Sequence, residues 1–448
     1  MQETALPHSG VRKDCTPDTG RLLKTCGETG EDMSGQNADR RNGVLLFVSV
    51  FLFWFSVYTY PSFLSTYAVD GLGATKVMAG MIVGSYGLTQ MVLRIPLGIV
   101  SDLLKKRKLF VMIGFGLSIA ASAGLSVVAL SAGGESVPRW LAWAALLFRG
   151  ISGMTAATWV NFTVLYSSSY HGDQVAAAMS RIVVPQCGSQ IVAMLLGAQL
   201  AGRLGELFAF LLAAAAGVAG LIVMAMVREQ PPVGAPVTFR SFAAVAKNRQ
   251  LITGTLLATI QQLVTWSTVQ GFVQNWACDV IGLTTAQLGF LSVANLLPNT
   301  VFSRFSGTVF SKRFGRRAVL TAGFAFIALA CCLYPRTDSL AALLAVQALL
   351  GSGVGLIMPL TMAGAIESVP DESRGAAMGF YQAVYGLGMF IGPVLSGAVI
   401  ERFSETSGAA VNAAPGYIAN FYTAMYVAAA GAALAFALTG SKRPKNGD

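Results

Sequence analysis

The sequence predicts an all-helical membrane protein with twelve transmembrane helices in two similar halves of six. Three observations indicate this fold: the composition, the recurrence of long apolar stretches, and an internal repeat. Of the 448 residues, 54% are hydrophobic and only 12% are charged, whereas a soluble domain carries about 25% charged residues. Because so little polar surface is available, lipid is the natural solvent for most of this chain.

Apolar stretches long enough to cross a membrane recur with short polar breaks between them. A helix needs about 20 apolar residues to cross the hydrocarbon core, whereas barrel strands would be shorter and would alternate polar with apolar residues. The first stretch is too long for the apolar region of a signal peptide. We expect helices near 43–68, 76–101, 108–131, 139–166, 175–201, 205–227, 250–277, 284–310, 317–335, 339–367, 375–402 and 417–440.

Segments outside these helices indicate the domain organisation. Residues 1–42 are polar, have no apolar period and are expected to form a disordered cytoplasmic tail, in which Met33 is an alternative start to Met1. The segment 228–249 is charged and carries three prolines. It predicts a cytoplasmic linker between an N-terminal bundle, 43–227, and a C-terminal bundle, 250–440. Residues 441–448 form a second cytoplasmic tail.

The distribution of basic residues predicts the orientation. Lys and Arg accumulate in cytoplasmic loops. The tails and the loops on their side hold most of these residues, while the opposite loops hold only Lys76, Arg139, Arg203, Arg336 and Arg402. Both termini are therefore expected in the cytoplasm, with the chain in the cytoplasmic membrane. The net charge of +10 is then a topology signal, and we expect no nucleic-acid partner.

The six cysteines predict neither a disulfide framework nor a metal site. Four lie in or beside apolar runs, and Cys15, Cys26 and His8 lack the spacing of a zinc finger. No cofactor is expected.

An internal repeat relates the two halves. A shift of 210 residues places Arg94 on Arg304, Ser101 on Ser311, Lys106 on Arg316 and Arg107 on Arg317. In each copy the segment ends a helix and enters a basic turn. Many transporters use such repeats to build a site where their halves meet.

These residues carry a resemblance to the major facilitator superfamily. Gly98-Ile-Val-Ser-Asp102-Leu-Leu-Lys-Lys-Arg107-Lys108 is similar to the family's loop motif, with Leu103 where a basic residue is usual and Lys105 where Gly is usual. The second copy keeps Gly315, Arg316 and Arg317, but Lys312 replaces the carboxylate. Arg149-Gly-Ile-Ser-Gly153 and Gly388-x-x-x-Gly392-Pro393 resemble family patterns in helices 4 and 11. The resemblance covers helices 1 to 12 and implies a secondary carrier that works by alternating access.

The resemblance also implies a gating role for the loop motif. The Asp102 carboxylate can bind exposed N–H groups at a helix N-terminus and neighbouring cations, and Gly98 lets another helix approach. The gating set is Gly98, Asp102, Lys106 and Arg107 with Gly315, Arg316 and Arg317. The alternative is that these residues only fix the topology.

Four arginines fall inside predicted helices: Arg94, Arg149, Arg181 and Arg304. A charge at the bilayer centre costs about 2.5–3.5 kcal/mol, so each arginine needs a partner or a wet cavity. Arg149 lies deepest, roughly 15 Å into its helix, and we expect it to contact the solute. Arg94 and Arg181 are shallower and can extend to the cytoplasmic interface.

Acidic residues predict the charge of the solute. No carboxylate or histidine sits deep in a predicted helix, and Asp102, Asp173, His171 and Glu367 all lie near the cytoplasmic face. A cavity holding arginine without carboxylates should be positive. It therefore favours a small anionic or zwitterionic organic solute. Protons remain a candidate coupling ion, although proton-driven transporters use buried acids or histidines.

Polar and aromatic residues inside the helices are candidates for the cavity lining. In the resembled family, helices 1, 4, 7 and 10 face the cavity. Gln262, Trp266 and Gln270 share one helix face through their i, i+4, i+8 spacing. For any single residue, a structural contact with a neighbouring helix is the alternative. The other candidates are Tyr58, Trp159, Asn295 and Gln382, with Tyr60, Asn161, Asn299 and Tyr381 in addition.

Other function classes have less support. An efflux antiporter for hydrophobic drugs or metabolites is the alternative within transport, but the sequence lacks the buried carboxylates that bind cationic drugs. A membrane enzyme would need a catalytic cluster within the helices, and ATP-driven transport would need a phosphate-binding loop, which the sequence lacks. A channel would need a selectivity filter. The expected partners are a small solute and membrane lipids.

Overall fold

The computed structural model describes residues 41–134, 137–168, 182–229, 245–370, 374–407 and 410–439. The chain divides into two compact units, Met1–Val44 and Leu45–Asp448, and the fold described below is that of the second unit. The expected tail 441–448, most of the linker 228–249 and Arg181 lie outside the described residues. So does the expected tail 1–42, except for Arg41 and Asn42, which begin the first helix.

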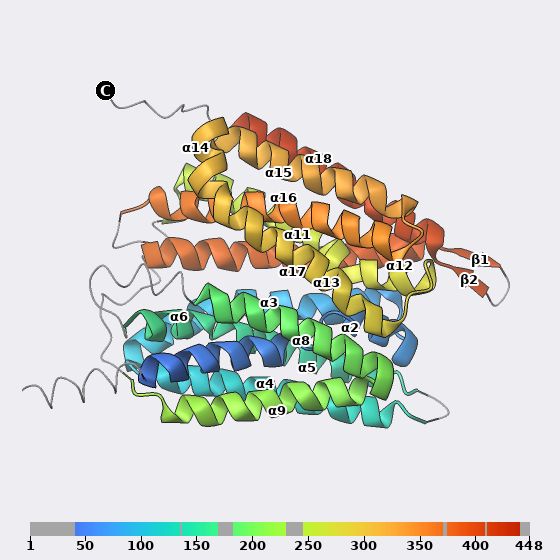
Figure 1. The fold of residues 1–448 in the computed structure, drawn as a ribbon, viewed down its shortest axis with the longest axis horizontal. Helices are drawn as coiled ribbons and strands as arrows, with labels where there is room; N and C mark the ends of the chain where they lie inside the picture. The colour runs from blue at the N-terminus through green and yellow to red at the C-terminus, as the bar shows by residue number, and fades with distance from the viewer. Residues whose placement is uncertain are drawn as a thin grey trace, which may run out of the picture. The chain divides into compact units, whose positions relative to one another are not determined.

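Helices account for the described part of the first half (Figure 1). The first helix, Arg41–Tyr58, continues after an irregular stretch into two short turns. The helix expected at 139–166 is broken at Thr158 into two pieces. The elements after the first helix are α2 (Leu64–Thr66), η1 (Tyr67–Gly71), α3 (Lys76–Leu104), α4 (Arg107–Ser131), α5 (Trp140–Ala157), α6 (Trp159–Ser168), α8 (Val183–Leu204) and α9 (Glu206–Met226).

The second half repeats this pattern and adds a short hairpin. Its elements are α11 (Arg249–Ser267), η2 (Thr268–Phe272), α12 (Val273–Asp279), α13 (Thr285–Phe305), η3 (Ser306–Phe310), α14 (Ser311–Phe314), α15 (Arg316–Leu333), η4 (Tyr334–Arg336), α16 (Leu340–Glu367), α17 (Arg374–Phe403), β1 (Glu405–Ser407), β2 (Ala410–Asn412) and α18 (Ala414–Leu438). The hairpin, which pairs Glu405 with Asn412, was not expected from the sequence.

The described residues include nine helices that are long and apolar enough to cross a membrane, and the predicted helical membrane fold is confirmed apart from the short hairpin. The remaining three expected ranges, 139–166, 250–277 and 284–310, are also helical. They contain breaks or polar residues, so for these three the crossing of the membrane stays a prediction.

Small residues bring the two halves together. Helix α3 packs along α17, and α8 packs along α13. A Cβ atom at Gly80 on α3 would overlap the backbone carbonyl of Pro393 on α17, and one at Gly202 on α8 would overlap the backbone of Ala286 on α13. Glycine is therefore required at both contacts, as in other helix packing without water, where close backbone approach supplies the attraction.

The repeat has a direct structural counterpart. Ser65 Oγ donates to Asn275 Oδ1 at 2.6 Å, and the two residues are 210 positions apart, the same shift that aligns the loop motifs. When two equivalent positions touch each other, they lie on the axis that relates the two copies. The contact between Ser65 and Asn275 therefore marks the axis between the halves.

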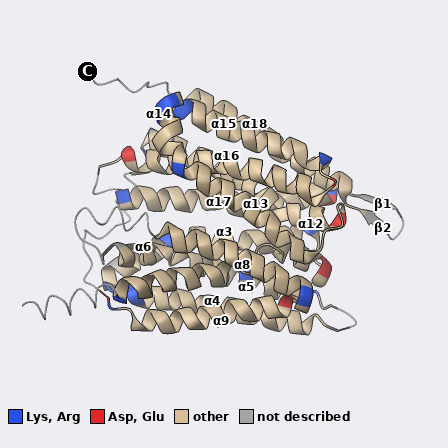
Figure 2. Cartoon of the chain, in the orientation of Figure 1, with Lys and Arg blue, Asp and Glu red and all other residues tan. Residues whose placement is uncertain are grey.

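The bundle has two different ends. We call the end that holds Lys105–Lys108 and Lys312–Arg317 the basic end, and the end that holds Lys76, Asp279 and the hairpin the opposite end. Figure 2 shows acidic residues gathered mainly around α12 at the opposite end, with basic residues at α14 on the basic end. These two ends set the frame for the cavity.

Candidate functional site

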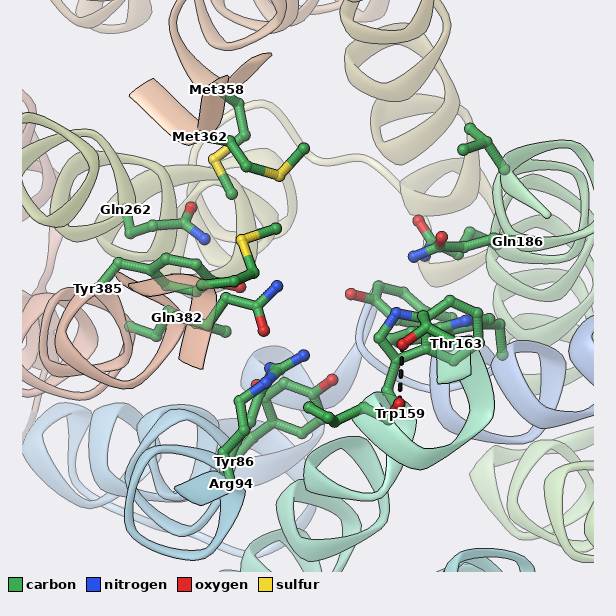
Figure 3. Close-up of a pocket in the computed structure, with 18 of the residues that line it drawn as sticks. Tyr86, Arg94, Trp159, Thr163, Gln186, Gln262, Met358, Met362, Gln382 and Tyr385 are labelled. Carbon is green, nitrogen blue, oxygen red and sulfur yellow. Dashed lines mark hydrogen bonds between the residues drawn. The ribbon is translucent and has the colours of Figure 1, made fainter. Parts of the chain in front are cut away.

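A cavity of about 870 Å³ lies between the halves (Figure 3). On α3 its lining begins at Tyr86, ten residues beyond Lys76, and runs to Ser101 near the basic end. Arg107 and Gly375, at the starts of α4 and α17, also line it. The cavity therefore extends toward the basic end and stops short of the opposite end.

One face of α3 supplies the polar strip of the N-terminal half. Tyr86, Gln90 and Arg94 all line the cavity, and their i, i+4, i+8 spacing places them on one side of the helix. Arg94 is 3% exposed, and its Nε and Nη1 atoms lie buried without a hydrogen-bond partner in the described part of the chain. The Oε1 atom of Gln90 is in the same situation. Unpaired buried polar atoms are rare because they cost free energy.

The charge of the lining follows from its residues. Arg94 and Arg107 are its cationic members, and no Asp or Glu is among the lining residues that the structure describes. The side chain of Asp102 lies outside that description. Guanidinium groups bind carboxylates and phosphates through paired N–H donors. The described lining is thus suited to an acceptor-rich or anionic group.

Arg149 lies behind the cavity wall and is not a lining residue. Its guanidinium carbon lies 4.4 Å from the ring centre of Tyr86 and 5.4 Å from that of Tyr60. Its Nη1 donates to Ser152 Oγ at 3.2 Å. The arginine that the sequence singled out thus contacts a ring that itself lines the cavity.

The other expected lining residues are brought together. All seven of these residues line the cavity, as do two of the four additional candidates; the other two, Tyr60 and Tyr381, do not. Arg304, the repeat partner of Arg94, is exposed on α13 outside the cavity. The lining includes Tyr58, Trp159, Gln262, Trp266, Gln270, Asn295 and Gln382, with Asn161 and Asn299.

Sequence reasoning missed several lining residues that a helical period would have found. Gln186 and Gln190 on α8 are four residues apart, and Met358 and Met362 on α16 have the same spacing. Tyr86 and Gln90 continue the face of Arg94. Each of these pairs repeats the i, i+4 signal that identified Gln262 and Trp266.

The two copies of the loop motif differ in structure. Lys105 ends α3 with φ 52°, and Gly315, 210 positions later, has φ 82°. A left-handed backbone strains any residue with a Cβ, so the second copy has the residue suited to this turn. Lys108 in the first copy donates from Nζ to the carbonyls of Ala225 and Val227 at the end of α9.

In the second copy, Glu367 provides the carboxylate that the motif lacks. Arg316 Nη1 lies 3.2 Å from Glu367 Oε2, and its Nη2 donates to the carbonyl of Leu360. A side chain at Gly364 would overlap the guanidinium. The cation therefore sits at the C-terminal end of α16, where the helix dipole favours positive charge. The neighbouring Arg317 lies 3.6 Å over the Phe436 ring, whereas Lys106 is exposed.

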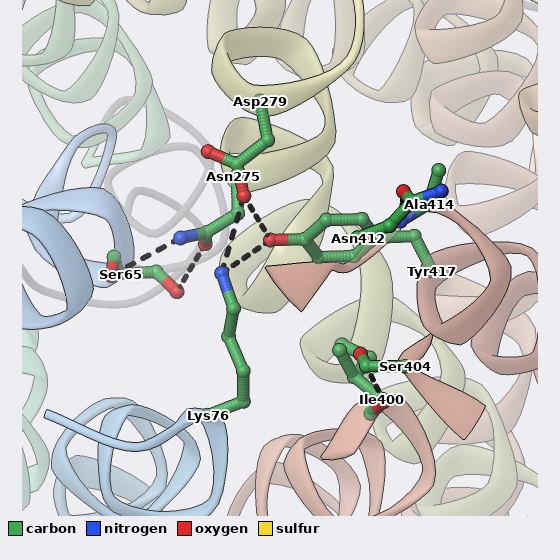
Figure 4. A network of polar contacts seen from close by, with 9 residues as sticks. All are labelled: Ser65, Lys76, Asn275, Asp279, Ile400, Ser404, Asn412, Ala414 and Tyr417. Atoms are coloured by element: carbon green, nitrogen blue, oxygen red, sulfur yellow. Dashed lines mark hydrogen bonds and ion pairs between the residues drawn. The ribbon is translucent and has the colours of Figure 1, made fainter. Parts of the chain in front are cut away.

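A polar network joins the halves at the opposite end (Figure 4). Lys76 Nζ at the start of α3 lies 3.2 Å from Asp279 Oδ2 and donates to the Tyr417 hydroxyl at 2.5 Å. The Tyr417 hydroxyl donates to the same Asp279 oxygen. The N–H of Val77 donates to Glu401 Oε1 at 2.8 Å. These contacts connect α3 with α12, α17 and α18.

Asp70 adds a titratable group to this end. Partial burial first, and then the carboxylates of Asp279 and Glu206, raise the pKa of Asp70 above the ordinary carboxyl range, while Lys76 acts in the reverse direction. Asp70 thus retains its proton to a higher pH than a free aspartate.

Two packed halves that enclose a cavity, closed at one end by cross-half contacts, are the architecture of a membrane carrier. The Major Facilitator Superfamily model matches residues 46–280 and 255–448. The chain belongs to this superfamily, and the family expected from the loop motifs is confirmed.

Curated relatives agree with this family. The multidrug transporter protein MdtP of Bacillus subtilis is 26% identical over 179 residues, which are 40% of this chain and 32% of that protein. The riboflavin transporter RibZ of Clostridioides difficile is 26% identical over 159 residues, 35% of each. The chain thus matches about a third of the length of these two proteins. An MFS-type transporter of Methanocaldococcus jannaschii is 22% identical over 374 residues, 79% of this chain and 91% of that protein.

Solved transporter structures share the fold. The nucleoside transporter NupG has a TM-score of 0.65 at 18% identity and covers 90% of this chain and 98% of its own. A bacterial homologue of the human lysosomal transporter Spinster, described as inward-facing and occupied, has a TM-score of 0.67 at 15% identity, covering 88% and 95%. At these identities the likeness concerns the fold alone.

Proposed function

We propose that this protein is a secondary carrier that moves a small anionic or zwitterionic organic solute across the cytoplasmic membrane by alternating access. The observation that carries the proposal is Arg94. It lies in the cavity wall, is 3% exposed, and keeps two guanidinium nitrogens unpaired among the described residues. A carboxylate or phosphate of the solute would satisfy these donors.

The contacts at the two ends support alternating access. Lys76, Asp279 and Tyr417 tie the halves together at the opposite end, while the cavity runs to the basic end. With the basic loops in the cytoplasm, this is an inward-facing state, the state named for the Spinster homologue. The halves proposed to move are 43–227 and 250–440, joined by the linker 228–249.

Arg149 has an indirect role in this proposal. Its guanidinium carbon lies 4.4 Å from the ring centre of Tyr86. Arg149 therefore holds the Tyr86 ring in place beside the solute and does not contact the solute directly. Protons are retained as a candidate coupling ion. Since no carboxylate is found in the described lining, a coupling proton would use acids at the ends of the bundle.

Efflux of hydrophobic drugs or metabolites is the second candidate, and the methionines favour it. Met194, Met358, Met362, Met378 and Met389 all line the cavity. Methionine adapts its shape to different ligands and is common at promiscuous binding surfaces. The multidrug transporter MdtP is one of the relatives. Under this alternative, binding would follow lipophilicity and would not depend on Arg94.

Ligand-induced stabilisation tests the proposal. A solute that binds only the folded state raises its stability by RT ln(1 + [L]/Kd), about 2.7 kcal/mol at a hundredfold excess over Kd. We expect anionic and zwitterionic metabolites to raise the melting temperature of the purified wild type, and Arg94→Gln to lose this effect. Arg304→Gln is the matched control, because Arg304 has the same charge and lies outside the cavity.

Transport is then measured as counterflow in vesicles, since carriers show saturable exchange. Stabilisation by cations or by neutral lipophiles that is equal in wild type and Arg94→Gln would contradict the anionic solute and favour efflux. Loss of anion binding in both Arg94→Gln and Arg304→Gln would remove Arg94 from its proposed role.

A further inference from the structure

We propose that the solute carries a planar conjugated ring system together with its anionic group, as in a fused-ring or heteroaromatic carboxylate. This inference rests on the proposed function, because Arg94 supplies the contact for the anionic group. It adds a second subsite, made of aromatic side chains, that selects the remainder of the molecule. Two aromatic walls and a set of unpaired amides carry the argument.

The first wall consists of Trp54, Tyr58 and Trp159, which we call the N-wall. All three line the cavity. Trp54 lies 4.9 Å from Trp159 and 5.5 Å from Tyr58, between ring centres. Phe53 is fully buried behind them and contacts both tryptophans. The N-wall rings are therefore held by packing, and little conformational freedom is lost when a ligand lies against them.

The second wall is formed by a pair of rings from different halves. Tyr86 on α3 and Trp266 on α11 stack with ring centres 5.5 Å apart and planes 17° apart. Arg149 lies over the Tyr86 ring, and both Tyr86 and Trp266 are more than nine-tenths buried. Figure 3 shows Tyr86 and Trp159 at the border of the same open space, with Arg94 reaching into it beside Gln382.

Unpaired amide atoms define what else the solute carries. Gln90 Oε1, Gln261 Oε1 and Asn161 Nδ2 are buried in the lining without a hydrogen-bond partner among the described residues. Together they present both acceptors and donors. A saturated hydrocarbon would leave them unsatisfied, at a cost. A heteroaromatic ring with N–H and carbonyl edges would offer them partners while one of its faces lies against the N-wall and its other side meets the Tyr86–Trp266 pair, in which Trp266 and Arg149 already cover the Tyr86 ring.

The size and chemistry of the cavity fit this class. About 870 Å³ lies in the upper part of the range for sites that enclose drug-sized ligands, about 300–1,000 Å³, so a fused ring fits better than a single one. Aromatic pairs gain roughly two- to tenfold in affinity beyond the effect of buried area. An aliphatic anion of equal size would lack this gain.

Four probes with one skeleton test the inference on the purified full-length protein. They are naphthalene-2-carboxylate, its saturated analogue decahydronaphthalene-2-carboxylate, the neutral naphthalene-2-carboxamide, and a naphthylmethyl trimethylammonium cation. The saturated anion is the more hydrophobic of the two carboxylates, so simple partitioning would favour it. We expect naphthalene-2-carboxylate to bind at least threefold more tightly in titration calorimetry.

Variants separate the two subsites. Trp159→Leu should abolish the preference for the aromatic anion while anion binding remains, and Tyr58→Leu on the same wall repeats the test if Trp159→Leu does not fold. Trp143→Leu is the control, because Trp143 is 60% exposed and lies outside the cavity lining. It should keep the preference unchanged.

The outcomes distinguish the two proposals. Equal binding of both carboxylates, each dependent on Arg94, would overturn the planar-ring inference and leave the anionic carrier intact. Binding of the carboxamide as tight as that of the carboxylate, unaffected by Arg94→Gln, would overturn the anionic solute and leave the aromatic subsite. Binding of the cation alone would overturn both.

Discussion

Replacement of Asp279 by Asn should open the opposite end of the bundle. The Asp279 carboxylate accepts from Lys76 Nζ at 3.2 Å and from the Tyr417 hydroxyl at 2.5 Å, and the Lys76 and Asp279 side chains are 14% and 28% exposed. We therefore assign the ion pair a stabilising free energy of about 1–2 kcal/mol, which lies between the contribution of an exposed ion pair and that of a buried hydrogen bond to a charged group. An amide in its place should shift the equilibrium toward the outward-open state about 5- to 30-fold.

Spin labels measure this shift. Ser131 at the end of α4 and Ala341 at the start of α16 are exposed at the opposite end, in different halves. In Asp279→Asn we expect the Ser131–Ala341 distance distribution to gain a longer component. Asp338→Asn is the control, since Asp338 lies exposed at the same end and is also an aspartate. The reasoning fails if Asp279→Asn and Asp338→Asn give the wild-type distribution alike.

Two further predictions concern single side chains. Arg149→Ala should abolish uptake while the protein remains inserted, because Tyr86 loses the cation 4.4 Å from its ring; Arg149→Lys should restore part of the uptake, and normal uptake in Arg149→Ala would refute the positioning role. Lys105→Gly should stabilise the fold by about 1 kcal/mol, because φ 52° strains a residue with a Cβ. Thermal unfolding measures this change. Lys106→Gly is the control: Lys106 has φ −122°, so its replacement should not raise the melting temperature. An unchanged melting temperature in Lys105→Gly would show that the turn holds no strain.

The fold could be predicted because lipid imposes strong constraints on sequence. Each span must satisfy its backbone polar groups internally, so long apolar stretches translate into helices with little ambiguity. The interruptions could not be predicted in the same way. The break at Thr158 and the π-helical turn Thr268–Phe272 depend on local side-chain hydrogen bonds, such as that from Thr158 Oγ1 to the Thr155 carbonyl.

The choice between Arg149 and Arg94 required the direction of the side chain. The sequence favoured Arg149 because of its depth in the membrane. Depth gives only the position of a residue along the helix axis and does not give the direction in which its side chain points. A helix also has faces, and a residue at the midplane can point toward a neighbouring helix instead of the cavity. Arg94 shares its face with Tyr86 and Gln90, a polar and aromatic strip at i, i+4, i+8. Gln262, Trp266 and Gln270 have the same spacing and also lie in the cavity lining.

The two copies of the repeat indicate which contacts are able to break during transport. Arg316 binds Glu367 and the Leu360 carbonyl, and all three residues belong to the second half, so this contact moves with that half. Lys76 and Asp279 belong to different halves, as do Ser65 and Asn275 on the axis. Contacts within one half are kept when the halves move relative to each other, whereas contacts between the halves at the closed end must separate before that end can open. Lys76–Asp279, together with Ser65–Asn275 at the same end, is therefore the cross-half contact that we expect to break when the carrier opens outward.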